Sequence, residues 1–206
     1  MARKTEAHEK PPASKDFTLD RRKAFPALIG DPSDALFIAG LAGTAKDVAD
    51  ICGKRNNYYA LAGVMGGAVS MGLGLALAQP KRRVIVATGD GELLMNVGSL
   101  AVCGVMNPPN LAIVCVDNGH YGETGYQKSH TSQGVDLEQI AMGSGIRITR
   151  TVSEPGQIGE AARLLRQSNG VSFILLRVAP TPPPSLKRDL DAGRAKDAFR
   201  TQLLGA

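Results

Sequence analysis

The stretches Val84-Ile85-Val86-Ala87-Thr88-Gly89-Asp90-Gly91-Glu92 and Leu111-Ala112-Ile113-Val114-Cys115-Val116-Asp117-Asn118 decide the fold. Each is a short apolar, β-branched run that ends in small, acidic or amide residues, which predicts a buried parallel strand ending at a functional edge. Between them, residues 93–106 carry apolar residues at helical spacing, and Pro108-Pro109 predicts the end of that helix. The sequence therefore predicts a strand–helix–strand unit within a doubly wound, mainly parallel α/β sheet that has helices on both faces.

Polar residues follow both strands of this unit. A parallel crossover is right-handed almost without exception and brings the carboxyl ends of its strands together, so we expect Asp90 and Asn118 to face one volume. A carboxylate and an amide oxygen form a reasonable partial shell for Mg²⁺, which completes its coordination with the phosphates of a substrate. Gly91 allows close backbone approach, and a helix beginning at Glu92 offers free N–H groups to an anion. These features predict a diphosphate ligand that carries Mg²⁺.

Gly89-Asp90-Gly91 together with Asp117-Asn118 resembles the signature of thiamine-diphosphate enzymes, which opens with Gly-Asp-Gly and closes with an Asn pair. The resemblance implies that Mg²⁺ is held by Asp90, Asn118 and the backbone carbonyl of His120. The chain departs from the pattern at Asp117, which replaces the first Asn, and at His120, where the family often has Gly. The second departure leaves the carbonyl usable and puts an imidazole near the cofactor.

The same resemblance implies further contacts with the cofactor. In relatives, the loop that corresponds to Gly40 to Thr44 lies near the diphosphate. Relatives also have a Gly-x-(large apolar)-Gly segment upstream of Gly-Asp-Gly, whose apolar side chain wedges between the two cofactor rings, and this segment corresponds to Gly63 and Met65 here. The Gly63 carbonyl would accept a hydrogen bond from the 4′-amino group, and Met65 would be the wedge, or else an ordinary core residue. The set expected to contact thiamine diphosphate is Gly40, Thr44, Gly63, Met65, Gly89, Asp90, Gly91, Glu92, Asn118, His120, Tyr121 and Gly122.

A long polar loop, residues 119–132, begins at the expected metal edge and is therefore a binding loop by position. Its Tyr-Gly-x-Thr-Gly-x-Gln pattern, followed by His-Thr-Ser, is similar to the small subunit of sulfopyruvate decarboxylases and the carboxyl-terminal part of phosphonopyruvate decarboxylases. The resemblance implies a small 2-oxo acid substrate with an anionic group. His120 and His130 are the candidate catalytic residues as proton donors or anion contacts, although a loop histidine is equally often only solvated.

Thiamine-diphosphate chemistry also needs a glutamate, which the family places on a separate pyrimidine-binding domain. The length of this chain accommodates only the diphosphate-binding domain, so we expect a pyrimidine-binding partner subunit and an α2β2 heterotetramer. Three alternatives remain open: a carboligase resembling acetolactate synthase, a non-catalytic cofactor-binding subunit, and a stand-alone nucleotide-binding module.

Composition narrows the class of protein. The chain has 206 residues, of which 43% are hydrophobic, which is enough for one large core. Its formal charge of +5 gathers near the two ends and only 4% of residues are aromatic, which argues against nucleic-acid binding. No stretch has the length of a membrane span and the start lacks a secretory signal, so we expect a cytoplasmic protein with no membrane partner. Cysteines occur at three widely spaced apolar positions and are expected to be buried thiols: Cys52, Cys103 and Cys115.

The expected organisation has three parts: a mobile arm over 1–16, the cofactor-binding domain over 17–180, and a proline segment with an amphipathic helix over 181–206. Within the domain, Asp20 and Thr44 are candidate helix caps, and the segment 68–78 is a helix whose Gly72 and Gly74 would permit tight packing. Further strands are expected over 34–40, 57–62, 146–149 and 171–178, and the last helix over 185–204.

Overall fold

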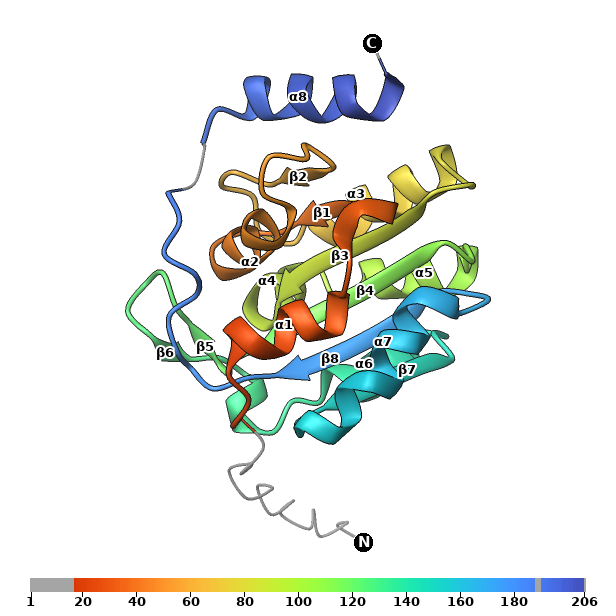
Figure 1. The fold of residues 1–206 in the computed structure, drawn as a ribbon. Coiled ribbons are helices and arrows are strands. Elements are labelled where there is room, and N and C mark those ends of the chain that lie inside the picture. Colours follow the sequence, from red (N-terminus) through yellow and green to blue (C-terminus); the bar gives the residue numbers. More distant parts are fainter. Residues whose placement is uncertain (1–16, 188–189, 206) are drawn as a thin grey trace, which may run out of the picture.

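A parallel six-stranded sheet forms the centre of the protein in the computed structural model, which describes residues 17–187 and 190–205. Its strands, in spatial order, are β2 (Tyr58–Ala60), β1 (Ala35–Ala39), β3 (Arg83–Gly89), β4 (Leu111–Asp117), β8 (Ser172–Arg177) and β7 (Ile148–Val152) (Figure 1). β5 (His120–Tyr121) and β6 (Gln127–Lys128) form a separate antiparallel ribbon. The expected strand–helix–strand unit is confirmed, with β3 and β4 as direct neighbours. The arm expected over 1–16 lies outside the described residues.

Helices cover both faces of the sheet (Figure 1). One apolar core lies under α1 (Arg21–Ile29), α2 (Gly43–Cys52) and α7 (Ile158–Gln167). The opposite core lies under α3 (Ala68–Ala78), α4 (Asp90–Met95), α5 (Ser99–Met106) and α6 (Leu137–Gly143). Short 3₁₀ turns at Pro32–Asp34, Thr131–Gln133 and Pro155–Gln157 complete these connections. The doubly wound α/β fold is therefore confirmed.

Strand alternation divides the apolar residues between the two cores. Phe37 and Ile85 belong to the core of α1, whereas their neighbours Leu36 and Val86 belong to the core of α3, because successive strand residues face opposite sides. A Cβ at Gly72 would overlap the Val86 side chain, so this glycine lets α3 approach β3 closely. Gly74 has no such neighbour, and tight packing therefore depends on Gly72 alone of the two.

The helix expected over residues 93–106 is wrong as a single element. The chain forms α4 and α5 with a break at Asn96 to Gly98, and the Asn96 amide donates to the Gly66 carbonyl at 3.0 Å. The apolar spacing continues across this break because both short helices pack on the same core. Hydrophobic periodicity therefore predicted the buried face correctly and could not reveal the turn.

Three boundaries also differ from expectation. Asp20 caps α1 as predicted, but Thr44 lies inside α2 and donates instead to the Leu41 carbonyl at 3.1 Å. The strand expected over 146–149 is β7, shifted toward the carboxyl end. The last helix, α8 (Ala192–Leu204), begins later than 185 because Asp191 caps it, accepting from Arg194 N at 3.0 Å. None of the helices in the described residues combines the length and apolarity needed to cross a bilayer.

Candidate cofactor site

A cavity of about 220 Å³ opens at the carboxyl edge of the sheet. Its wall comes from the residues that follow β1, from the turn that joins β3 to α4, and from the residues that end β4 and continue into β5. These are the positions where a doubly wound sheet leaves a crevice between diverging connections, because the connections of β1 and β3 lead to opposite faces. The fold therefore brings the polar ends of β3 and β4 into one volume, as the sequence predicts.

Asp90 begins α4 and is buried, with 3% of its surface exposed. Its Oδ2 accepts hydrogen bonds from the hydroxyls of Ser129 and Thr131, the latter at 3.2 Å. Thr131 Oγ1 also lies 2.7 Å from Asp117 Oδ1, so the single hydrogen of this hydroxyl is shared between the two carboxyl groups, with the shorter contact to Asp117. Burial raises the pKa of Asp90, and burial together with the nearby charge of Asp90 raises the pKa of Asp117 to about 7. The site therefore holds two carboxyl groups together away from water, where the charged form of each is less favourable than in solution.

Asn118 and His120 form a turn immediately after β4. Asn118 Oδ1 accepts from the backbone N–H of His120 at 3.0 Å, and His120 Nδ1 lies 2.8 Å from the Asn118 carbonyl oxygen. Gly119 between them has a φ of +67°, which a glycine adopts without strain. The turn fixes the Asn118 amide and the His120 ring on the wall of the cavity.

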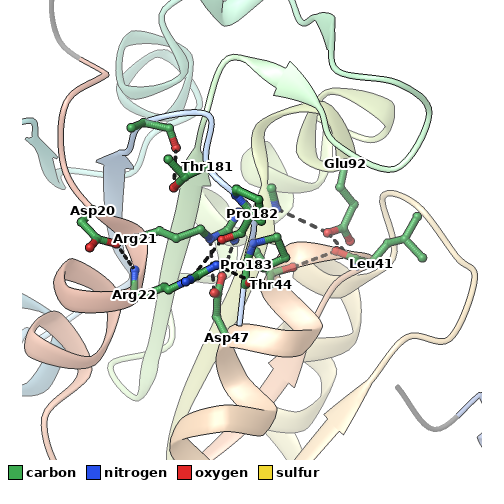
Figure 2. Close-up of polar contacts among 12 residues, drawn as sticks. Asp20, Arg21, Arg22, Leu41, Thr44, Asp47, Glu92, Thr181, Pro182 and Pro183 are labelled. Carbon is green, nitrogen blue, oxygen red and sulfur yellow. Dashed lines mark hydrogen bonds and ion pairs between the residues drawn. The ribbon is translucent and has the colours of Figure 1, made fainter. Parts of the chain in front are cut away.

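Glu92 ties the residues after β1 to the end of β3. Its Oε2 accepts from Thr88 Oγ1 at 3.0 Å and from the backbone N–H of Leu41 at 3.3 Å, as Figure 2 shows for Leu41. A Cβ on Gly40 would lie 2.6 Å from Oε1 and still closer to Oε2, so the carboxylate occupies the space that a side chain would fill. Gly40 therefore makes room for Glu92.

Gly91 has a comparable role on the other side of the cavity. A Cβ at this position would lie 2.7 Å from Cδ1 of Tyr121, so the tyrosine ring packs directly against the glycine backbone. Thr124 and Gln127 bond each other at 2.8 Å and thereby order the loop beyond Tyr121. The glycine thus lets the loop close over the start of α4.

The predicted site residues divide into two groups in the structure. Gly40 and Gly63 do not line the cavity, and His130 is exposed and lies outside it. The remaining predicted residues all line it, from four segments of the chain: Thr44; Met65; Gly89, Asp90, Gly91 and Glu92; Asn118, His120, Tyr121 and Gly122.

Sequence reasoning missed three side chains at the site. Ser129 and Thr131 bond Asp90 from a long loop, and the length of that loop prevented us from predicting which of its residues reach the site. Hydroxyl residues that closely follow a glycine-rich turn are a sequence feature that could have indicated them. Arg21 lines the cavity from the start of α1, remote in sequence from every motif. Only tertiary packing brings Arg21 to this edge.

Two buried carboxylate oxygens near the cavity, Glu92 Oε1 and Asp117 Oδ2, have no hydrogen-bond partner among the described residues. Unpaired buried acceptors are costly, and a bound cation close to them lowers that cost. The oxygen donors at the cavity, from Asp90, Asn118 and the His120 backbone, are of the type that Mg²⁺ prefers. The residues present therefore fit a site for Mg²⁺ and an anionic cofactor.

Comparison with known proteins agrees with this geometry. The family model described as thiamine pyrophosphate enzyme, C-terminal TPP binding domain, matches residues 42–176. The sulfopyruvate decarboxylase subunit beta of Methanocaldococcus jannaschii is 43% identical over 57% of this chain and 62% of that subunit. The subunit of the same name from Methanothermobacter thermautotrophicus is 39% identical over 91% of this chain and 97% of that subunit.

A solved structure shows the same fold. The thiamine diphosphate-dependent 4-hydroxybenzoylformate decarboxylase of Rhodococcus jostii RHA1 superposes with a TM-score of 0.67 at 23% identity, covering 85% of this chain and 36% of that one. The chain thus spans about a third of the length of this solved decarboxylase. From its sequence, its fold and the residues that its family model matches, the chain belongs to the family of the C-terminal TPP-binding domain of thiamine pyrophosphate enzymes.

Proposed function

We propose that the chain is the small, β-type subunit of a thiamine-diphosphate- and Mg²⁺-dependent decarboxylase. Its substrate is a 2-oxo acid with an anionic group, such as sulfopyruvate or phosphonopyruvate, and its products are an aldehyde and CO₂. The observation that carries the proposal is the cavity at the ends of β3 and β4, where Asp90, Asn118 and the His120 backbone converge. The names of the related β subunits favour this substrate class.

Asp90, Asn118 and the His120 carbonyl are the proposed Mg²⁺ ligands. The hydroxyls of Ser129 and Thr131 both bond Oδ2 of Asp90, so they fix the carboxylate and leave Oδ1 as the candidate ligand atom. Gly89 and Gly91 let the backbone approach the diphosphate closely, and α4 begins between them. A divalent cation at this point would also offset the charge that Asp90 and Asp117 share across Thr131.

Other cavity residues would orient the cofactor and the substrate. Met65 is 37% exposed at the cavity wall, as a side chain that contacts a ligand would be, and we propose it as the wedge between the cofactor rings. Bound thiamine diphosphate supplies the electron sink for the pair of electrons released as CO₂ leaves. His120 Nδ1 faces the Asn118 carbonyl, so Nε2 is the ring nitrogen left to face the ligand, and it can give a proton to the product only from the doubly protonated imidazolium form. His130, outside the cavity, is not part of this proposal.

The activating glutamate is proposed to come from a partner subunit. Glu92 and Glu123 are the glutamates on the cavity wall of the described chain, and Glu92 is committed to Thr88 and Leu41. Large apolar side chains are exposed on α4 and α5, where Met95, Val102 and Val105 are 66%, 54% and 84% exposed. This surface is suited to a pyrimidine-binding partner, and we propose an α2β2 assembly.

The test is release of CO₂ by the purified chain, alone and with the product of its neighbouring gene. Both samples receive thiamine diphosphate and Mg²⁺ and a panel of 2-oxo acids that includes sulfopyruvate, phosphonopyruvate and pyruvate. We expect CO₂ and an aldehyde from the pair only, with an anionic substrate preferred. Activity of the lone chain would contradict the need for a partner glutamate.

Product analysis separates this function from its alternative within the family. A carboligase resembling acetolactate synthase adds the carbanion equivalent to a second carbonyl, so its product is an acyloin or acetohydroxy acid instead of an aldehyde. If the pair binds the cofactor and releases no CO₂ from any member of the panel, the decarboxylase proposal is wrong and a non-catalytic binding subunit is favoured.

A further inference from the structure

A buried arginine reaches the cofactor cavity from α1, an element remote in sequence from the acidic residues of the site. Arg21, the first residue of α1, is 4% exposed and lines the cavity beside Pro183. Its Nε donates to Asp47 Oδ1 at 3.2 Å, and its Nη2 forms an ion pair with Asp47 Oδ2 (Figure 2). Asp47 is also buried, on α2, so both charges of the pair are withdrawn from bulk water.

One nitrogen of the guanidinium remains available. Within the part of the chain that the structure describes, Nη1 makes no hydrogen bond, yet it is not among the buried polar atoms that lack a partner. The guanidinium lies against Gly43, where a Cβ would be 2.7 Å from Nη2 and 2.8 Å from Nη1. Glycine at position 43 therefore allows Arg21 to reach the first turn of α2.

That first turn also presents unused donors to the cavity. Ala42 is the N-cap of α2 and provides no side-chain cap, while the Thr44 hydroxyl is committed to the Leu41 carbonyl. Residues 42–44 line the cavity together with Lys46 from the next part of the helix. An uncapped helix N-terminus carries partial positive charge and favours an anion. The start of α2, Lys46 and the guanidinium of Arg21 thus bring cationic and N–H donor groups to the same cavity that Asp90 lines.

Fold stability does not by itself account for this arrangement. A buried ion pair loses the hydration of both charges and is often no more stable than an apolar pair of similar size. Asp47 holds the guanidinium in one orientation, and a guanidinium so fixed binds phosphate oxygens with little further loss of conformational freedom.

We propose that Arg21, oriented by Asp47 and placed beside the N-terminus of α2, binds the diphosphate of the cofactor directly. This inference rests on the proposed cofactor site and adds to it a ligand group that is separate from the proposed metal ligands. Asp47 is then a positioning residue, and Gly43 is the position that keeps the approach open.

Calorimetric titration of the full chain, alone and co-purified with its partner subunit, tests the inference in the presence of Mg²⁺. The variants are Arg21→Met and Asp47→Asn, and the matched control is Arg22→Met. Arg22 is the exposed neighbour of the same charge, and its guanidinium donates to the Pro182 and Pro183 carbonyls at 3.2 and 3.5 Å (Figure 2). The ligands are thiamine diphosphate and thiamine monophosphate.

Arg21→Met should weaken thiamine diphosphate binding by about tenfold to a hundredfold, since it removes a charge-assisted contact. It should weaken monophosphate binding less, and Arg22→Met should stay within about twofold of the parent chain. Asp47→Asn keeps the cation and should retain most of the affinity. If the ion pair is purely structural, Arg21→Met and Asp47→Asn should lose the same affinity, and each loss should be equal for thiamine diphosphate and thiamine monophosphate. That result would overturn the inference.

Two other outcomes are also decisive. If the parent chain binds thiamine diphosphate and Arg21→Met binds it equally well, the inference fails while the proposed function stands. If the parent chain binds no cofactor, either alone or co-purified with its partner subunit, the proposed function fails and the inference fails with it. Should Arg21→Met not fold, Arg21→Lys replaces it, because lysine keeps the charge but loses the planar guanidinium. The affinities of Arg21→Lys for thiamine diphosphate and thiamine monophosphate are then compared with those of the parent chain.

Discussion

Replacing Gly40 by alanine tests how the structure uses the space at the end of β1. The added Cβ would lie 2.6 Å from Glu92 Oε1 and closer to Oε2, so the buried carboxylate has to move. Moving it breaks the hydrogen bonds from Thr88 at 3.0 Å and from the Leu41 N–H at 3.3 Å. Gly40 is not among the glycines with positive φ, so the effect comes from overlap and not from backbone strain.

The loss should be large for a single methyl group. Hydrogen bonds to a charged group contribute about 1.5–3 kcal/mol each, so losing both of them predicts a loss of about 3–6 kcal/mol in unfolding free energy. The entropic gain from Gly to Ala, about 0.4–1 kcal/mol, offsets little of this. The net loss is then at least about 2 kcal/mol, and at about 2–4 °C per kcal/mol for a chain of this size Tm should fall by about 4 °C or more in differential scanning calorimetry.

Gly74→Ala is the matched control, because a Cβ there meets no atom within 4 Å and lies on the exposed side of α3. It should raise Tm slightly through better helix propensity. The double variant Gly40→Ala/Glu92→Ala should be more stable than the sum of the two single losses predicts, since the overlap is then relieved. A Gly40→Ala chain whose Tm lies within about 2 °C of the parent chain would refute the reasoning.

Three further predictions concern the site, the core and the surface. Thr131→Val removes the hydroxyl between Asp90 and Asp117 and should lower the unfolding free energy in urea by about 1.5–3 kcal/mol; a change below about 0.5 kcal/mol would show that the bridge does not matter. Val105→Lys, on a side chain 84% exposed, should leave Tm unchanged yet abolish co-purification with the partner subunit, and unimpaired assembly would exclude α5 from that interface. Burial raises the pKa of Cys52 to about 12, that of Cys103 to about 11 and that of Cys115 well above its usual value. None of the three thiols should therefore react with iodoacetamide at pH 8 until denaturant is added, and rapid labelling of the native chain would contradict their burial.

The strands and the polar residues at their ends could be predicted from sequence because they depend on local composition. The apolar runs before Asp90 and Asn118 have few conformations that bury them, and their convergence follows from the handedness of the crossover. The buried state of the cysteines follows from apolar context in the same way, and the structure confirms it.

What the sequence could not provide depends on distant contacts. The break at Asn96 is stabilised by the carbonyl of Gly66, thirty positions earlier. Arg21 reaches the cavity only because Gly43 and Asp47 meet it there. Periodicity carries no signal of such contacts, since each requires the relative placement of two elements that are separate in the chain.

The measurement that tests the account most directly is calorimetric titration of thiamine diphosphate into the parent chain and an Asp90→Asn variant, each with and without Mg²⁺. Asn has nearly the shape of Asp and removes only the charge that the proposed metal requires. We expect saturable binding by the parent chain that depends on Mg²⁺, and a loss of at least about tenfold in affinity for the variant. Binding that is independent of Mg²⁺ and equal in both proteins would contradict the proposal that Asp90 holds the cofactor through a metal ion.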